Sequence, residues 1–320
     1  MSEVGAFRVF GKLPSHADFV HWGSNTEALS SFDDWLTACV EWAHARAGEP
    51  WRAAFRAGTA RAFLHRLDPV GDGGTFVVGA LAPSQDEAGR LFPISVAAPV
   101  RLDPDFKRSP HLLPLICETI WQTAGECAAQ LGVTPAAEGA ALLAGLPAQE
   151  EPNFSDSEQA YQAWGSELPL VELWALIAPG QSLAGLRDAL RVLAEAVRPH
   201  REEFPNTQLT LRVPLGAAGG AAVCFWLDLV RRLSGWQRTV PSFYWSHDGA
   251  EGQLTMHLGA APPATVSELW LATATRDEYC SLDAPIPESV LELLPALPPK
   301  AERALREPTS VAAFLASLSD

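Results

Sequence analysis

A serine beside an acidic residue and several scattered histidines are the residue types in this chain that suit nucleophilic catalysis. Ser84 lies in the segment Ala82–Asp86, which lacks the glycines that let a nucleophilic serine stand on a sharp strand-to-helix turn. A catalytic triad is assembled in space, so the histidines that qualify as a base are His16, His21, His65, His111 and His247. None of them has a partner pattern nearby in the sequence. We therefore expect Ser84 to be a turn residue.

Two glycine-containing segments invite comparison with phosphate-binding loops. A P-loop has four residues between its glycines and a serine or threonine after its lysine. Here five residues separate Gly5 from Gly11, and Leu13 follows Lys12, so we expect a turn at the end of a strand. The segment Gly216–Gly220 precedes a predicted helix and has the backbone N–H groups to cradle an anion. Its alanines favour close packing of the backbone instead.

Metal-ligating patterns are weak in this sequence. Neither a paired Cys-x-x-Cys nor a helical His-x-x-x-His occurs, and His16, Asp18 and His21 form only a loose cluster. We expect no metal and no cofactor.

Two pairs of neighbouring carboxylates, at residues 33–34 and 202–203, are candidates for acid–base chemistry. Adjacent side chains on a helix diverge by about 100°, so neither pair is expected to share one site. We interpret Asp33 and Asp34 as charges in the first turn of a helix, and Glu202 and Glu203 as part of a solvated face.

The charge balance opposes binding to nucleic acid or to an anionic membrane. The chain has 320 residues, with 23 basic and 38 acidic side chains and a net charge of −15. Residues 111–205 alone have four basic and thirteen acidic side chains, a net charge of −9. No signal peptide is evident, and the longest apolar run, residues 215–227, is shorter than the roughly 20 residues of a membrane span. We expect a cytoplasmic protein without membrane insertion.

Cysteine and tryptophan usage adds two expectations. Five widely spread cysteines are an odd number and favour buried free thiols in a reducing compartment: Cys39, Cys117, Cys127, Cys224 and Cys280. Most of the eleven tryptophans are expected in the core. A few exposed ones would be anchors for a protein partner.

The periodicity of the chain up to residue 134 predicts helices that cover one antiparallel sheet. A helical stripe begins at Ser31 and ends before Gly48, and another helix is expected over residues 112–131. A brief helix is expected at 51–58. The predicted strands are 6–10, 61–67, 75–82 and 92–100, with a hairpin connection at 68–74.

The remainder divides into a helical, acidic connection and a second α/β region. Helical periodicity runs through residues 182–197, and Pro135 after Thr134 suggests an earlier helix start. Beyond residue 205 we expect strands at 208–213, 240–245 and 254–258, a turn at 248–249, a buried helix at 219–233 and a last helix at 309–318, capped by Thr309 or Ser310. The predicted class is α+β (α/β), with divisions at 1–134, 135–205 and 206–320.

Two dense motifs, at residues 11–20 and 79–94, resemble the TagF/ImpM family of bacterial proteins associated with type VI secretion. The family pattern is similar to G-K-L-P-x-x-G-D-F and G-x-L-x-P-S-x-D-x-x-G-R-x-F-P-L, and the resemblance covers approximately residues 1–130. Two departures are Ala17, where the family usually has glycine, and Ile94, where leucine is common. The positions carried over are Gly11, Lys12, Leu13, Pro14, Asp18, Phe19, Pro83, Ser84, Asp86, Gly89, Arg90, Phe92 and Pro93.

The resemblance implies a regulator without catalytic activity. TagF-like proteins repress type VI secretion after translation and are associated with its forkhead-associated scaffold protein and with a threonine phosphorylation pathway. Some are fused to a phosphatase domain, but this chain shows no metal-carboxylate phosphatase pattern.

Three motif charges are open to two interpretations. Asp86 and Arg90 suit an ion pair that fixes a loop, whereas Asp18, Asp86 and Arg90 are also candidates for contact with a partner. We favour the loop-fixing role. Two other functions stay open: a small-molecule or nucleotide sensor, suggested by the glycine-rich segments and the histidines, and a cryptic hydrolase that uses Ser84 or a cysteine.

Overall fold

The helix α1 (Glu27–Arg46) begins at a capping residue that its sequence supplies. The computed structural model describes residues 3–67, 75–102, 107–135, 138–146, 154–205, 208–246, 252–271, 279–282 and 286–318. Thr26 caps α1 by accepting a hydrogen bond from Leu29 N at 3.3 Å, so the helix begins one turn before the predicted Ser31. It ends before Gly48, whose φ of +56° opens α2 (Gly48–Ala57).

Ten strands of the described residues form one sheet, and all but one of its pairs are antiparallel. The order is β10-β7-β9-β8-β4-β5-β6-β2-β3, and β1 pairs with β6. The predicted antiparallel sheet is thus confirmed. Its strands at residues 3–4, 20–23 and 279–281 were not predicted. The bounds are β1 (Glu3–Val4), β2 (Arg8–Gly11), β3 (Val20–Gly23), β4 (Arg61–Arg66), β5 (Thr75–Ala82), β6 (Ile94–Arg101), β7 (Leu209–Pro214), β8 (Ser242–Trp245), β9 (Gln253–Leu258) and β10 (Tyr279–Ser281).

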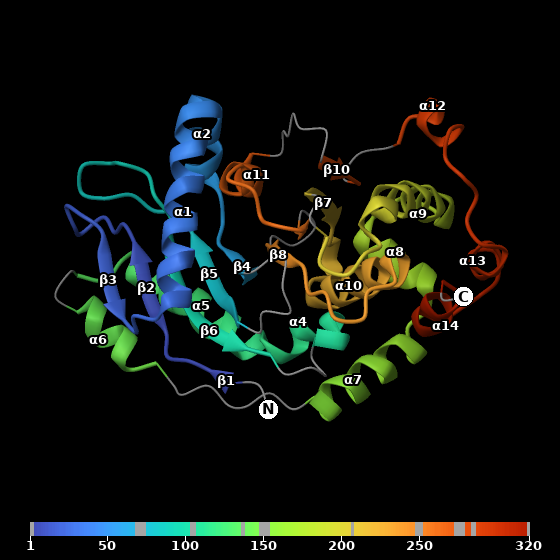
Figure 1. Cartoon of the computed structure of the whole chain (residues 1–320), viewed down its shortest axis with the longest axis horizontal. Helices are drawn as coiled ribbons and strands as arrows, with labels where there is room; N and C mark the ends of the chain where they lie inside the picture. The colour runs from blue at the N-terminus through green and yellow to red at the C-terminus, as the bar shows by residue number, and fades with distance from the viewer. Residues whose placement is uncertain are drawn as a thin grey trace.

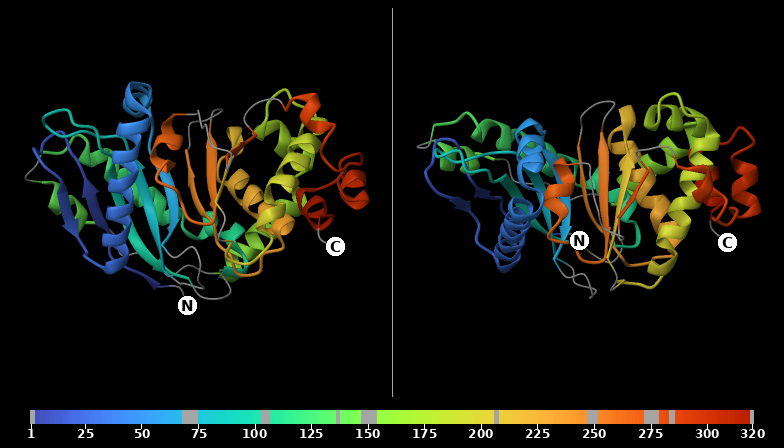
Figure 2. Two further views of the ribbon diagram at one scale, coloured as in Figure 1. Left: turned by 45° about the horizontal axis from the view of Figure 1, so that its top comes forward. Right: turned by 90° about the horizontal axis from the view of Figure 1, so that it is seen from above.

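Pairing of β4 with β8 joins the early and the late parts of the chain. Ala62 lies opposite Trp245 and Leu64 opposite Phe243. Figure 2 shows the sheet running without a break from the blue N-terminal strands to the orange C-terminal ones. The three-part division at residues 134 and 205 stays a prediction. The predicted connection at 68–74 and turn at 248–249 lie outside the described residues.

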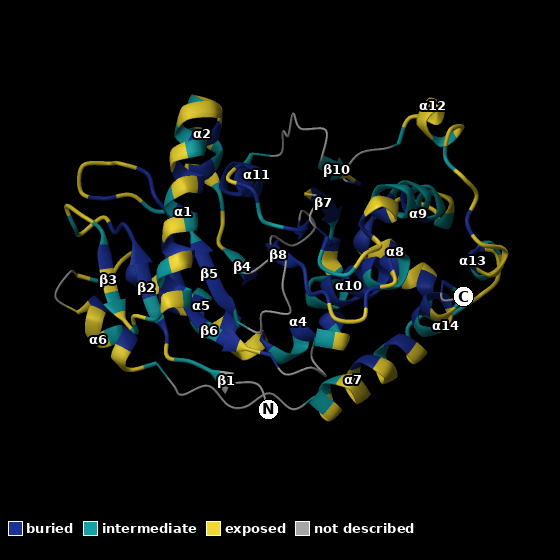
Figure 3. Cartoon of the chain, in the orientation of Figure 1, coloured by how far each residue is buried: buried dark blue, intermediate teal, exposed yellow. Residues whose placement is uncertain are grey.

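Side-chain alternation along the strands builds a separate core on each face of the sheet. Phe63 and Val77 contribute to the core with α1 and α2, whereas their neighbours Leu64 and Val78 contribute to the core with α5. The first core also contains residues of α11 (Thr265–Trp270). Figure 1 shows α1 and α5 on opposite sides of β5 and β6, and Figure 3 shows these strands buried.

The helix predicted at 112–131 is broken near Cys117. It consists of η1 (Pro110–Leu112), α4 (Leu113–Ile116) and α5 (Glu118–Leu131). The helical middle is confirmed, but its first helix begins at Gly139 rather than at Pro135, which has no helical assignment. Its elements are α6 (Gly139–Ala144), α7 (Phe154–Glu167), α8 (Leu170–Ile177), α9 (Leu183–Val197) and η2 (Arg198–His200).

The two C-terminal helices predicted at 219–233 and 309–318 are confirmed, whereas the helices at 265–270, 288–291 and 299–304 were not predicted. The helix α10 (Gly220–Ser234) follows η3 (Gly216–Ala218) and ends at Gly235, whose φ is +75°. Ser310 caps the last helix by accepting from Ala313 N. That helix is α14 (Val311–Ala316), and α12 (Glu288–Leu291) and α13 (Pro299–Ala304) precede it. Across the described ranges, no helix is both long and apolar enough to span a membrane.

Candidate functional site

The two sequence motifs form adjacent loops at one end of the sheet. The first loop follows β2 and the second precedes β6, and these strands pair with Phe10 opposite Ser95. Gly11 ends β2 with φ at +137°, and a Cβ there would lie 2.1 Å from the carbonyl oxygen of Pro93. Glycine is therefore required at position 11 for both backbone conformation and space.

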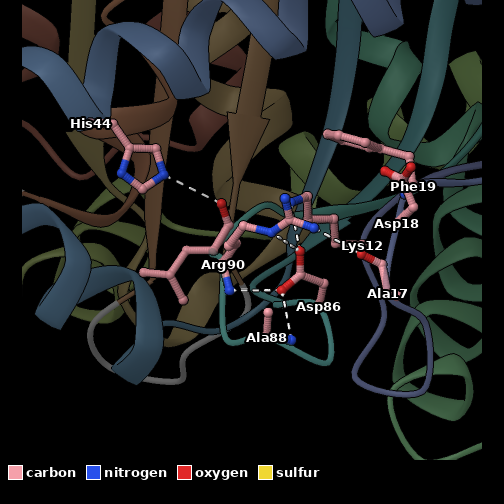
Figure 4. A network of polar contacts seen from close by, with 9 residues as sticks. Lys12, Ala17, Asp18, Phe19, His44, Asp86, Ala88 and Arg90 are labelled. Carbon is pink, nitrogen blue, oxygen red and sulfur yellow. Dashed lines mark hydrogen bonds and ion pairs between the residues drawn. The ribbon is translucent and has the colours of Figure 1, made fainter.

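Asp86 binds both loops through its carboxylate. Its side chain is fully buried, and Oδ2 accepts from Lys12 Nζ at 2.7 Å and from Arg90 Nε at 2.6 Å. Oδ1 accepts from the backbone N–H groups of Arg90 at 2.8 Å and Ala88 at 3.1 Å. Figure 4 shows Lys12 and Arg90 converging on this carboxylate. Burial alone would raise the pKa of Asp86, but the hydrogen bonds from Lys12 and Arg90 hold it well below its usual range.

Further contacts connect the loops directly. Arg90 Nη2 donates to the carbonyl of Ala17 at 2.8 Å, and the N–H of Glu87 donates to the carbonyl of His16 at 3.0 Å. Phe204 is the only non-glycine residue with positive φ among the described residues, so Ala17 occupies its place in the loop without backbone strain. The substitution of the usual glycine is accommodated.

Aromatic side chains of the same segments pack against one another in a cluster. Phe19 stacks on Phe10 with ring centroids 5.5 Å apart and meets Phe92 edge-on at 4.8 Å. Lys12 Nζ lies 4.9 Å from the centre of the Phe19 ring, so its charge is held by both Asp86 and a ring face. Leu13 is buried as well.

The exposed side of the two loops is polar and carries both signs of charge. We call it the motif surface, and it comprises Pro14, Asp18, Glu87, Gly89 and Arg90, all of which are exposed. The side chain of Arg90 is 61% exposed although its Nε is bound to Asp86. Asp18 is exposed, and its Oδ1 accepts from the N–H of Phe19 at 2.8 Å.

Comparison with known proteins agrees with the motifs. Residues 8–148 match the model of the TagF N-terminal domain, described as type VI secretion system-associated. This match confirms the resemblance of the N-terminal part of the chain to the TagF family. A crystal structure of PA0076 from Pseudomonas aeruginosa PAO1 is similar, with 17% sequence identity, 92% of this chain and 100% of that chain covered, and a TM-score of 0.47. No curated protein matches.

Within the TagF domain, Asp33 corrects a sequence interpretation. It was expected as a first-turn or solvated charge, but α1 begins earlier and places it, buried, in the second turn. Arg8 Nη2 lies 2.7 Å from Asp33 Oδ2, and Arg8 Nη1 donates to Asn25 Oδ1 at 2.7 Å. Burial raises the pKa of Asp33 to about 6 despite the guanidinium beside it.

Ser84, the candidate nucleophile, and the candidate histidines described next each contact a different residue. The carbonyl of Ser84 accepts from the N–H of Phe92 at 3.1 Å, and Ser84 lies in a loop outside any helix or strand. His65 Nδ1 lies 2.7 Å from the Tyr244 hydroxyl, and burial lowers the pKa of His65 to about 3. The His16 ring packs on Trp22 in the TagF domain, and His21 packs on Phe10. His247 lies outside the described residues.

The cysteines are packed as expected. The second glycine segment is closely packed at Gly216, whereas a Cβ at Gly219 or Gly220 would meet no atom within 4 Å. Four thiols are buried and Cys280 is half-buried, all of them free. Burial raises the pKa of Cys117 to about 12 and that of Cys127 to about 11, which keeps these thiols protonated. A Cβ at Gly216 would lie 2.1 Å from the carbonyl of Leu176, so this glycine serves close packing. In the part of the chain that the structure describes, no group of three or more potential ligands is placed to hold a metal ion.

Sequence reasoning missed a buried carboxylate on α10. Asp228 is completely buried, and its Oδ1 accepts from Arg231 Nη2 at 2.8 Å and from Arg232 Nε at 3.0 Å. The Tyr161 hydroxyl donates to Oδ2 at 3.3 Å. Burial, together with the positive charges of Arg231 and Arg232, lowers the pKa of the neighbouring His111 to about 4, although Asp228 opposes that shift. The spacing Asp-x-x-Arg-Arg on a helix was the available signal.

Proposed function

We propose that this chain is a non-enzymatic, post-translational repressor of type VI secretion in the cytoplasm. It acts by binding a component of the apparatus, the forkhead-associated scaffold protein, through the motif surface. The observation that carries the proposal is the buried Asp86 carboxylate, which holds two loops 74 residues apart in sequence and presents their exposed faces together.

A surface of this kind favours recognition of a protein. The loops are held before binding by Lys12, Arg90 and the backbone bonds between them, so little conformational freedom is lost when a partner docks. Arg90 offers an exposed guanidinium to a carboxylate, while Asp18 and Glu87 offer acceptors to a cation. Asp86 positions these groups and is itself out of reach of a partner.

The test is binding of the purified full chain to the purified scaffold protein by biolayer interferometry. The double variant Asp18→Lys/Glu87→Lys reverses two exposed charges and leaves Asp86 with its partners. We expect it to bind at least about tenfold more weakly than the wild type. The matched control, Glu288→Lys, changes an exposed charge on α12, at the opposite end of the molecule (Figure 1), and should bind as the wild type does.

Equal binding by the double variant would place the contact elsewhere. Absence of binding by the wild type, together with a thermal shift caused by a nucleotide, would instead favour the sensor. A nucleotide at a hundred times its dissociation constant adds about 2.7 kcal/mol to the free energy of unfolding.

A further inference from the structure

A large apolar cavity lies away from the motif surface, between segments distant in sequence. Its volume is about 760 Å³, and it is lined by β4, β5 and β8 and by faces of α5, α7 and α10. Trp121 and Trp245 meet edge-on in its wall at a centroid distance of 3.9 Å, and Tyr161 stacks on Trp164 at 5.4 Å. Aromatic walls of this kind are typical of sites that bury apolar side chains.

Small residues keep the cavity open where helices border it. A Cβ at Gly125, in the middle of α5, would meet no atom within 4 Å, and the same holds for Gly220 at the start of α10. Glycine inside a helix costs about 1 kcal/mol relative to alanine, and packing in the isolated chain gives no reason for it at position 125. Ala160 of α7 and Ala221 of α10 add two further small side chains to the lining of the cavity.

One face of α5 forms a wall of the cavity. Glu118, Trp121, Gln122 and Gly125 line the cavity at positions i, i+3, i+4 and i+7, so one face of this helix is directed at it. Faces of α7 and α10 complete the border. Small residues on bordering helices let another helix approach to the usual 8–10 Å between axes.

The charge around the cavity indicates the sign of the occupant. Glu118 is the charged side chain among the lining residues, and it is exposed at the rim. The helices α5 and α7 contain no Lys or Arg, and their acidic residues are Glu118, Glu126, Asp156, Glu158 and Glu167. Residues 111–205 have the net charge of −9 noted above. An apolar groove with an acidic border is complementary to a helix with an apolar face and basic flanks.

We propose that this cavity receives a basic amphipathic helix of a protein partner. Its apolar side chains enter the space above Gly125 and Gly220, and a lysine or arginine at its edge pairs with Glu118. The proposal does not depend on the motif surface, because the cavity is built from other residues.

The test uses the purified full chain and a fluorescent Leu/Lys peptide with leucines at i, i+3, i+4 and i+7, followed by anisotropy. Gly125→Leu fills the open space, and Glu118→Lys reverses the rim charge. Each should weaken binding by about tenfold or more. The matched controls are Gly132→Leu, at the exposed end of α5, and Glu126→Lys, on the same helix but outside the cavity lining. Both should bind as the wild type does.

Three results would overturn the proposal. One is equal binding to the wild type and to both cavity variants, and another is equal binding of a scrambled peptide of the same composition. The third is no peptide binding at all; if the neutral dye Nile red then binds the wild type but not Gly125→Leu, the cavity takes a small apolar molecule instead. Since no secretion component is present in this assay, its failure is separable from failure of the proposed function.

Discussion

Lys12 Nζ lies 2.7 Å from Asp86 Oδ2, in an ion pair that closes a 74-residue separation in sequence. Both side chains are withdrawn from solvent, with 8% and 0% of their surfaces exposed. The pair joins the two motifs of the TagF domain. Removing Asp86 leaves the buried Lys12 ammonium without its counter-charge, whereas Asp86 without Lys12 would keep its ion pair with Arg90.

Replacement of Asp86 by asparagine should destabilise the protein strongly. Lys12 would stay buried without its counter-charge, which costs about 3 kcal/mol or more. Urea unfolding followed by tryptophan fluorescence measures the change. Asp18→Asn, in the same loops but exposed, should change the free energy of unfolding by less than about 0.5 kcal/mol. Similar losses in both variants would contradict the role assigned to Asp86.

Two glycines of the motifs should respond differently to alanine. Gly11→Ala places a Cβ 2.1 Å from the Pro93 carbonyl, so the β2 and β6 ends must separate, and we expect a loss of about 3 kcal/mol or more. Gly89 also has positive φ, at +79°, but a Cβ there meets no atom within 4 Å. Gly89→Ala should therefore cost only about 1–2 kcal/mol. Thermal unfolding of both variants checks the order, and a larger loss at Gly89 would be inconsistent with this geometry.

Only part of the contact network between the two motifs could be predicted from the sequence. The loop-fixing bond between Asp86 and Arg90 was predictable because it joins residues four positions apart. Lys12 as the second partner was not, because nothing in either motif specifies that β2 and β6 are neighbours. The same limit hid the pairing of β4 with β8, which brings residues about 180 positions apart together.

The start of α1 was predicted wrongly, because its N-cap residue lies before the apolar stripe from which the helix was predicted. Ser31 and two aspartates looked like a helix start, but Thr26 begins α1 five residues before. That shift turns Asp33 from a solvated charge into the buried partner of Arg8. By contrast, alternation predicted the strand at 75–82 with its bounds and the strand at 253–258 to within one residue, and Ser310 is one of the two caps expected from residue type.

Stability should fall in mild acid because of buried histidines. The unfolded chain protonates His65 near its ordinary pKa of 6.5, whereas burial lowers the folded value to about 3. Stability from this group is therefore complete above pH 6.5 and is lost as the pH falls toward 3, at about 1.4 kcal/mol per pH unit. Urea titrations at several pH values should show a shallower slope for His65→Phe. An unchanged slope in His65→Phe would refute the assignment.

Cysteine labelling should separate the thiols by burial and bear on the hydrolase alternative. With Ellman's reagent, the native protein should react at most slowly and at Cys280 alone, because Cys39, Cys117, Cys127 and Cys224 are buried. Burial also raises the pKa of Cys280 to about 11, so even this thiol is mostly protonated near neutral pH. All five should react in denaturant. Rapid reaction of a buried thiol in the native protein would revive a cysteine nucleophile.

Type VI secretion in cells that lack this protein tests most directly whether the chain represses secretion through the motif surface. We expect secretion of the apparatus's own substrates to rise after deletion and to be suppressed again by the wild-type chain and by Glu288→Lys, but not by an equally abundant Asp18→Lys/Glu87→Lys variant. Unchanged secretion after deletion, or full suppression by that double variant, would contradict the account.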